Sequence, residues 1–264
     1  MKLEELAFSG IKIGIFGLSG SGKTRLAGTF VDAGEVTEDS GRLLHMICSS
    51  NGMNEARSLK GIEGIDPVEI KIPDDLSKLV QYARESGKYS TVVLDHVTEY
   101  TNLILASIIG RDKMPEQSAW GIAKQQDYAQ MSSQAKEYLR ELFDFPGNVI
   151  IIGQERVFNA AEEGDSSELI QPNVSIACTP SVSGWIAPAC DYFTQMFKRT
   201  KTIRTRKKIG DKVKEITKRT NEVEYCLRCG PDQVVLTKWR CGPGNPVPRV
   251  IVDPSYTKLE EFFG

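Results

Sequence analysis

One run of eight residues constrains the fold of this chain more than any other part of its sequence. Residues 17–24 read Gly-Leu-Ser-Gly-Ser-Gly-Lys-Thr, which matches the pattern G-x-x-x-x-G-K-[ST] at every fixed position. A short, mainly apolar run at 11–16 precedes these residues, and the run at 25–30 after them can continue as a helix. The sequence therefore predicts a strand, a glycine-rich phosphate-binding loop and a helix, in that order.

The chemistry of this loop follows from its residue types. Gly17, Gly20 and Gly22 allow backbone conformations that a Cβ atom would forbid, so successive N–H groups can point at phosphate oxygens. The start of the helix adds partial positive charge. Lys23 is expected to reach the β- and γ-phosphates, and the Thr24 hydroxyl to hold Mg²⁺. We therefore expect a nucleoside triphosphate site whose cradle consists of Gly17, Leu18, Ser19, Gly20, Ser21, Gly22, Lys23 and Thr24.

A second apolar run ends in an acid that can complete the metal site. Asp95 follows the strand-like residues 91–94, and this arrangement places a carboxylate beside the loop to hold Mg²⁺. We therefore expect Thr24 and Asp95 to hold the metal together. The alternative for Asp95 is a capping or turn role at the end of the strand.

The group that would orient or deprotonate water is less well defined. Glu55, in the loop after the second expected strand, is the best candidate for a catalytic base, and Glu99 lies one helical turn past Asp95. Each of the two glutamates could instead be a solvated surface residue. Gln154, at the end of an apolar run, is a candidate sensor of the γ-phosphate, and Glu155 beside it is equally well placed.

Apolar runs that alternate with helical patterns predict an α/β fold. Each expected strand is nearly all apolar, which indicates a mostly parallel sheet covered on both faces. We expect such a doubly wound sheet over residues 1–200, with helices at 73–87 and 119–145. The expected strands lie at 11–16, 42–48, 91–95, 148–154 and 191–197.

The last part of the chain differs in character and is expected to form a β-rich extension over 201–264, packed on the core. An edge strand at 246–254 and a short helix up to Phe263 are expected near its end. The segments expected to form β-hairpins are 212–218, 222–228 and 233–240, of which the last two are separated by Gly230-Pro231-Asp232.

The chain has a net charge of −2, but one segment is strongly basic. Residues 198–219 hold eleven lysines and arginines and two acids, a local charge of +9, so the other residues carry −11. This asymmetry indicates a polyanionic partner for the segment. As a strand it would place Arg204, Arg206 and Lys208 on one face, about 6.6 Å apart, with Lys207 between them. A solvated, mobile loop is the alternative.

The cysteines and the apolar runs indicate where in the cell the protein is expected. No apolar run reaches the roughly 18 residues of a membrane helix, and the first residues do not resemble a signal peptide. Six cysteines without an export signal are typical of reduced thiols in the cytoplasm. Cys226, Cys229 and Cys241 suggest a zinc knuckle, but no fourth ligand lies nearby in the sequence, so reduced cysteines in a hairpin are the preferred interpretation.

These motifs together resemble RecA-like P-loop ATPases, and more narrowly the phage AAA-type ATPases that include the Sak4 single-strand annealing proteins. The similarity covers roughly residues 8–200 and weakens towards the C-terminus. One departure concerns the catalytic base, because relatives usually place an acid directly after the second strand, where this chain has residues 48–51 (Cys-Ser-Ser-Asn). The segments that carry the resemblance are 13–24, 91–96, Trp120-Gly121, 149–155 and 237–240.

The resemblance implies an ATP- and Mg²⁺-dependent protein that acts on single-stranded DNA in phage recombination or strand annealing, in the cytoplasm of a bacterial host. It also implies homo-oligomeric rings or filaments with ATP at the subunit interface, where a neighbour supplies positive charge. Lys238 and Arg240, two residues apart and so on one face of a strand, suit such contacts. An exposed, charged strand face is the alternative.

Two other functions share the same motifs. A small-molecule or nucleotide kinase would use the same loop and sheet, with the basic segment as an arginine-bearing lid. A nucleotide-dependent assembly protein that does not hydrolyse ATP would fit the missing acid after the second strand. Phosphate transfer without DNA favours the kinase, and binding without turnover favours the assembly protein.

Overall fold

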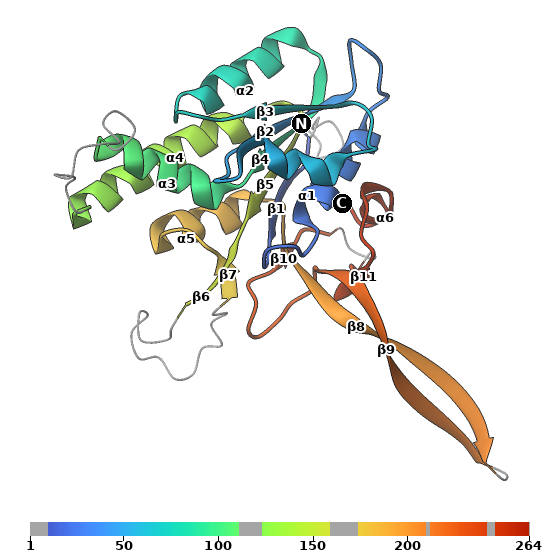
Figure 1. Ribbon diagram of the computed structural model, residues 1–264. Helices are drawn as coiled ribbons and strands as arrows, with labels where there is room; N and C mark the ends of the chain where they lie inside the picture. Colours follow the sequence, from blue (N-terminus) through green and yellow to red (C-terminus); the bar gives the residue numbers. More distant parts are fainter. Residues whose placement is uncertain (1–9, 111–122, 159–173, 210–211, 242–245, 264) are drawn as a thin grey trace, which may run out of the picture.

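The computed structural model describes residues 10–110, 123–158, 174–209, 212–241 and 246–263, with the backbone alone at 204–209 and 212–218. Within these residues lies a nine-stranded, mostly parallel sheet with helices on both faces (Figure 1). The sheet order is β11-β9-β8-β1-β5-β4-β2-β3, and β10 pairs with β8. These strands are β1 (Lys12–Phe16), β2 (Arg42–Ile47), β3 (Ile65–Glu69), β4 (Tyr89–Asp95), β5 (Asn148–Gly153), β8 (Tyr192–Ile209), β9 (Lys212–Arg228), β10 (Lys238–Trp239) and β11 (Val250–Val252).

The doubly wound α/β fold and all five strands expected in the core are confirmed. β1 lies between β5 and β8 and is parallel to both, so its C-terminal end points the loop at residues 17–22 towards the same sheet edge as Asp95. A separate two-stranded sheet consists of β6 (Glu155–Val157) and β7 (Val174–Ile176). In the part of the chain that the structure describes, no helix has the length and apolar character needed to cross a membrane.

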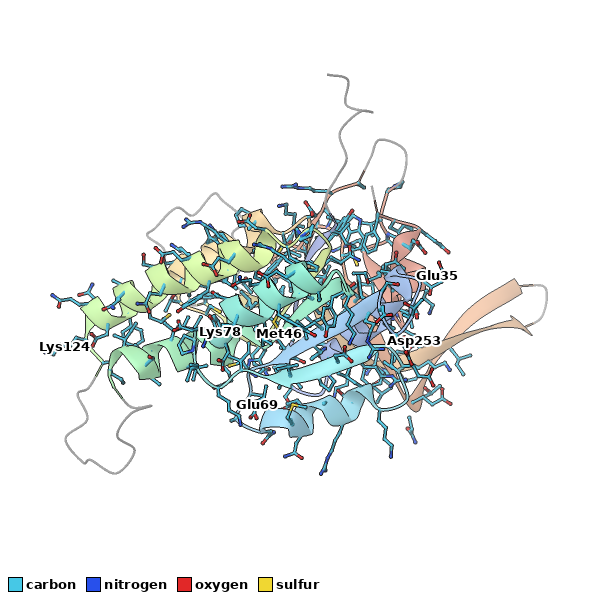
Figure 2. All side chains as sticks on the ribbon, turned by 90° about the horizontal axis from the view of Figure 1, so that it is seen from above. Glu35, Met46, Glu69, Lys78, Lys124 and Asp253 are labelled. Atoms are coloured by element: carbon cyan, nitrogen blue, oxygen red, sulfur yellow. The ribbon has the colours of Figure 1, made fainter. Side chains whose placement is uncertain are left out.

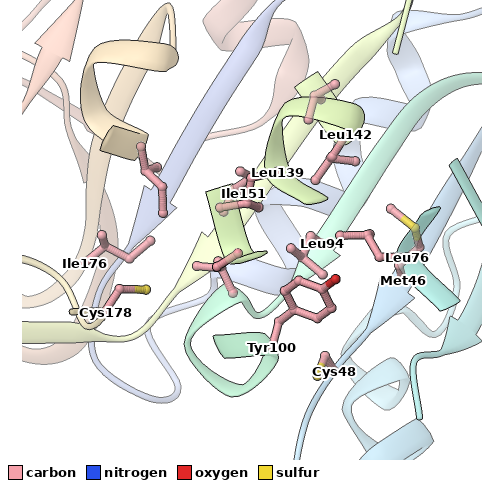
Figure 3. Packing of buried hydrophobic residues seen from close by; sticks show 14 of the residues in the cluster. Met46, Cys48, Leu76, Leu94, Tyr100, Leu139, Leu142, Ile151, Ile176 and Cys178 are labelled. Atoms are coloured by element: carbon pink, nitrogen blue, oxygen red, sulfur yellow. The ribbon is translucent and has the colours of Figure 1, made fainter. Parts of the chain in front are cut away.

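Both faces of the sheet are buried at β1, β2, β4 and β5, which is why these strands read as continuous apolar runs. Val92 and Leu94 of β4 pack on one face, and Val93 packs on the other. The first face carries α2 (Asp75–Ser86), α3 (Val97–Ile108), α4 (Gln125–Phe143) and α5 (Pro180–Ala189), and Figure 3 shows Leu94 within this cluster. The second face carries α1 (Lys23–Gly28) and the 3₁₀ helix η2 (Thr29–Ala33), with α6 (Tyr256–Glu260) from the end of the chain.

Among the elements that were not predicted, β3, α3 and α5 each have a local reason. β3 is a partly exposed edge strand that contains Pro67, and edge strands are where proline is tolerated. α3 begins two residues after Asp95 and its apolar content hides the helical period, and α5 contains Pro188. The predicted helices at 73–87 and 119–145 correspond to α2 and α4, whereas residues 119–122, with Trp120-Gly121, lie outside the described residues.

The expected arrangement of the C-terminal hairpins is wrong. Segments 212–218 and 222–228 are a single strand, β9, which pairs antiparallel with β8 in one long hairpin. Its inner end pairs with β11 rather than with 233–240, of which only β10 is a strand. The boundary expected at residue 200 therefore falls inside β8. The edge strand and the short final helix are confirmed as β11 and α6.

The β8–β9 hairpin projects from the body of the molecule, and this shape is plain in two views (Figures 1 and 2). Arg204, Arg206, Lys207 and Lys208 lie in the outer half of β8, where the backbone is paired with β9 from Thr217 to Val213. The backbone is therefore a strand here, as predicted. The basic residues lie in the outer half of the hairpin, which we call the arm and which extends furthest from the body of the molecule.

Candidate nucleotide-binding site

The loop at residues 17–22 joins β1 to α1 with backbone conformations that favour glycine. Gly17, Gly20 and Gly22 have φ values of 153°, 70° and 96°. Glycine is also required at position 17 because of a close approach to β8. A Cβ atom there would clash with the carbonyl oxygen of Met196, at 2.1 Å. The cradle expected from the octet is therefore present as a folded loop at the N-terminus of α1.

Lys23 is held across this loop. Its Nζ donates hydrogen bonds to the carbonyl oxygens of Gly17, at 2.8 Å, and Leu18, at 2.9 Å. The residue is only 7% exposed. Burial lowers the pKa of the Lys23 ammonium, and the charges of Asp95, Glu155 and Glu55 oppose that shift. A phosphate chain entering the loop would meet an ammonium that is already positioned and only weakly solvated.

Thr24 and Asp95 meet at the end of β4, as the sequence predicted. The Thr24 hydroxyl donates to Oδ2 of Asp95 at 2.7 Å. Burial opposes ionisation of Asp95, but hydrogen bonds from His45 and Thr24 outweigh it and lower the pKa of the carboxyl. A hydroxyl and a carboxylate at hydrogen-bond distance are oxygen ligands of the kind that Mg²⁺ prefers, and a P-loop site adds oxygens from the phosphates. The residues therefore fit a magnesium ion.

His45 is a further residue of this site that the sequence did not single out. Its Nε2 lies 3.1 Å from Oδ2 of Asp95, and the ring on β2 is fully buried. Because an ionised carboxylate only accepts, Nε2 carries the proton, and the buried Nδ1 has no partner among the described residues. His45 therefore fixes one oxygen of Asp95 together with Thr24.

We expect His45→Leu to lower the free energy of unfolding by about 1–3 kcal/mol, because it leaves a buried carboxylate without one of its two donors. His45→Gln, whose amide can donate to the same oxygen, should restore most of that loss. Urea unfolding of both variants followed by circular dichroism measures the difference. Equal stability of His45→Leu and the native protein would show that the bond contributes nothing.

Glu55 and Gln154 line the same cavity as Lys23 and Asp95, so the structure brings the four predicted catalytic residues together. Glu55 lies in the 3₁₀ helix η3 (Gly52–Leu59), where Oε1 accepts from Ser49 and Asn51. Gln154 follows β5, and its backbone N–H is bonded to Thr98.

The other two acids considered at this site are placed differently. Glu155 accepts from Nε2 of Gln195 at 2.9 Å, and neither it nor Glu99 lines the cavity. Glu99 lies in the first turn of α3, where its backbone N–H donates to Nδ1 of His96. Of the glutamates considered as a base, Glu55 is therefore the one that faces the cavity.

The cavity itself has a volume of about 640 Å³, within the range of pockets that hold ligands of nucleotide size. One part of its lining is the loop and α1, and another is Glu55, Asp95, His96 and Gln154. A third part was missed because it comes from distant segments, namely Met196, Tyr225, Asp253, Pro254 and Ser255.

Lys238 and Arg240 both have partners within their own chain. Nζ of Lys238 donates to the carbonyl oxygens of Pro188, at 2.8 Å, and Cys190, at the end of α5. Arg240 forms an ion pair of 2.8 Å with Asp191. These contacts stabilise a helix end and a strand end, and contact with a neighbouring subunit stays a prediction.

The cysteines considered for zinc differ in exposure. Cys226 and Cys229 are buried and Cys241 is exposed, and all three are free thiols. Burial raises the pKa of the Cys229 thiol to about 12, which disfavours the thiolate that zinc would bind. Within the described ranges, no group of three or more His, Cys, Asp or Glu side chains is placed to hold a metal.

Comparison with known proteins agrees with this geometry. A profile of the family described as AAA domain matches residues 9–224. None of the curated proteins compared with the chain is significantly similar to it. The matched residues include the loop, Asp95, Glu55 and Gln154, whereas Tyr225 and residues 253–255 follow the matched region.

Proposed function

This chain belongs to the AAA domain family of P-loop ATPases, and from that premise we propose that it binds and hydrolyses ATP while acting on single-stranded DNA in phage recombination or strand annealing. The observation that carries the proposal is the meeting of Lys23, Thr24 and Asp95 in one cavity behind a folded phosphate-binding loop. The Sak4 resemblance of the sequence supports the finer assignment to a DNA-annealing branch.

In this mechanism the predicted site residues act separately on the phosphate chain, the metal and the attacking water. The loop N–H groups and Lys23 bind the phosphate chain and stabilise charge that develops on the transferred phosphoryl group. Thr24 and Asp95 would hold Mg²⁺, and His45 fixes the orientation of the Asp95 carboxylate. A bound metal would supply positive charge that offsets the charge of the phosphate chain.

Hydrolysis also needs a residue that accepts a proton from the attacking water and a residue that senses the γ-phosphate. Glu55 is the proposed base, because it is the candidate glutamate that lines the cavity, and its hydrogen bonds to Ser49 and Asn51 orient its carboxylate. Gln154 is the proposed sensor, because it lines the cavity at the end of β5. Its backbone bond to Thr98 ties that position to α3.

The β8–β9 hairpin is the proposed site for single-stranded DNA. Its outer half carries Arg204, Arg206, Lys207 and Lys208, and an arm that projects from the body can follow a nucleic acid backbone. Its inner end contributes Met196 and Tyr225 to the nucleotide cavity, so ligands at the two sites contact one element. We further propose that the protein assembles into rings or filaments with ATP between subunits.

We expect single-stranded DNA to stimulate ATP turnover, and expect replacement of the four arm residues by glutamine to remove that stimulation. Affinity falls as salt rises, and each phosphate contact adds about 0.7 to the steepness of the plot of log affinity against log salt concentration. Loss of four contacts should therefore make this plot less steep by about 3. The measurements are steady-state phosphate release with and without DNA, and DNA binding by fluorescence anisotropy over a range of salt concentrations.

The control for net charge replaces four exposed lysines elsewhere by glutamine and should keep both the stimulation and the slope. Turnover that is insensitive to DNA would contradict the proposal. Phosphate transfer to a nucleoside monophosphate would instead identify a kinase, and binding without turnover would identify an assembly protein. The control lysines are Lys60, Lys71, Lys78 and Lys124.

A further inference from the structure

The nucleotide cavity has a wall that lies outside the recognised motifs. Tyr225 on β9 and residues Asp253, Pro254 and Ser255 after β11 line it together with Gly22 and the first turns of α1. The P-loop pattern does not explain what this wall would bind, since residues of that pattern contact only the phosphate chain of a nucleotide. The cavity is therefore larger than phosphate recognition requires.

The ring of Tyr225 is positioned against the phosphate-binding loop. A methyl group built on Gly22 would lie 3.2 Å from Cδ1 of Tyr225 and 3.2 Å from Cε of Met196. Tyr225 is nevertheless 44% exposed and lines the cavity. An aromatic ring that lies beside the phosphate-binding loop and lines the cavity can offer a face on which a planar base stacks.

The segment beside Tyr225 is fixed to the body of the molecule. The backbone N–H of Asp253 donates to the carbonyl oxygen of Tyr225 at 2.7 Å, and that of Tyr256 donates to the Thr29 hydroxyl at 2.9 Å. The ring of Tyr256 packs edge-on against Phe30, with centroids 5.2 Å apart. Figure 2 shows Asp253 next to the root of the β8–β9 hairpin. The wall is therefore preformed.

We propose that this wall is the nucleoside subsite, with Tyr225 stacking on the base of the nucleotide. The inference rests on the proposed ATP site and assigns its base-binding half to a part of the chain beyond the family match. It also makes the root of the hairpin a ligand contact. Stacking uses the aromatic face of the ring, so the Tyr225 hydroxyl is not required.

The test compares Mg²⁺-ATP with Mg²⁺-tripolyphosphate, which has the phosphate chain but no nucleoside. Isothermal titration calorimetry on the full chain should show that Tyr225→Ala weakens ATP binding about tenfold and leaves tripolyphosphate binding unchanged, because stacking is lost only where a base is present. Tyr225→Phe should bind both ligands as the native protein does. Tyr128→Ala is the matched control, because Tyr128 on α4 is 45% exposed and lies away from the cavity.

Two outcomes overturn the inference. Unchanged ATP binding in Tyr225→Ala shows that the ring does not stack on the base, and equal weakening of both ligands shows that the ring only supports the loop. In either case, loss of ATP binding in Lys23→Ala would leave the proposed function intact. If the native protein binds neither ligand and Lys23→Ala changes nothing, the proposed function itself is wrong.

Discussion

Replacing Lys23 by alanine is expected to abolish ATP turnover while the fold is kept. The ammonium is the buried cation that the loop holds at 2.8 and 2.9 Å from two of its own carbonyl oxygens. Without it, the charge that develops on the phosphoryl group loses its main donor from the protein, and we expect turnover to fall at least 10²–10³-fold, the order measured for one lost transition-state donor. Phosphate release and calorimetric ATP binding measure the loss.

The fold should tolerate this change, because burial already disfavours the charged form of Lys23. We expect the free energy of unfolding to change by about 1 kcal/mol, measured by urea unfolding. Lys78→Ala, at an exposed position of α2, is the control and should turn over ATP normally. Normal turnover in folded Lys23→Ala would refute the phosphate-binding role of the loop.

Asp95→Asn is expected to separate nucleotide binding from metal use. The asparagine oxygen can still accept from Thr24 and His45, which bond to one oxygen of Asp95 now, so the local structure should persist. The negative charge that holds Mg²⁺ is lost, so we expect the Mg²⁺ concentration for half-maximal turnover to rise at least tenfold and turnover to fall by about 10². A titration of turnover against Mg²⁺ measures both.

ATP binding without Mg²⁺ provides the internal comparison for this variant. It should not weaken in Asp95→Asn, because removal of a carboxylate near the phosphates also removes a repulsion. Asp39→Asn changes an exposed carboxylate that does not line the cavity and should behave as the native protein. An unchanged Mg²⁺ requirement in Asp95→Asn would exclude Asp95 as a metal ligand.

The residues that lie together in the structure as the sequence predicted are those with a local cause. The loop is defined by eight consecutive residues, and Asp95 by the apolar run directly before it, so neither depends on distant contacts. The core strands were equally readable, because burial on both faces makes each one a continuous apolar run. The long hairpin was misread because its pairing is non-local, with Arg228 opposite Gln195 rather than a residue after the 230–232 turn.

The phosphate-binding loop, its lysine and the acid that faces it were determined by the sequence alone, because each is specified within one strand and the turn that follows it. Only the tertiary structure decided that His45 supports Asp95 and that Tyr225 and residues 253–255 close the cavity. The physical reason is sheet pairing. β2 lies beside β4, while β8 lies beside β1 and is followed in the sheet by β9 and then β11, so side chains 50 to more than 200 positions apart converge on one sheet edge.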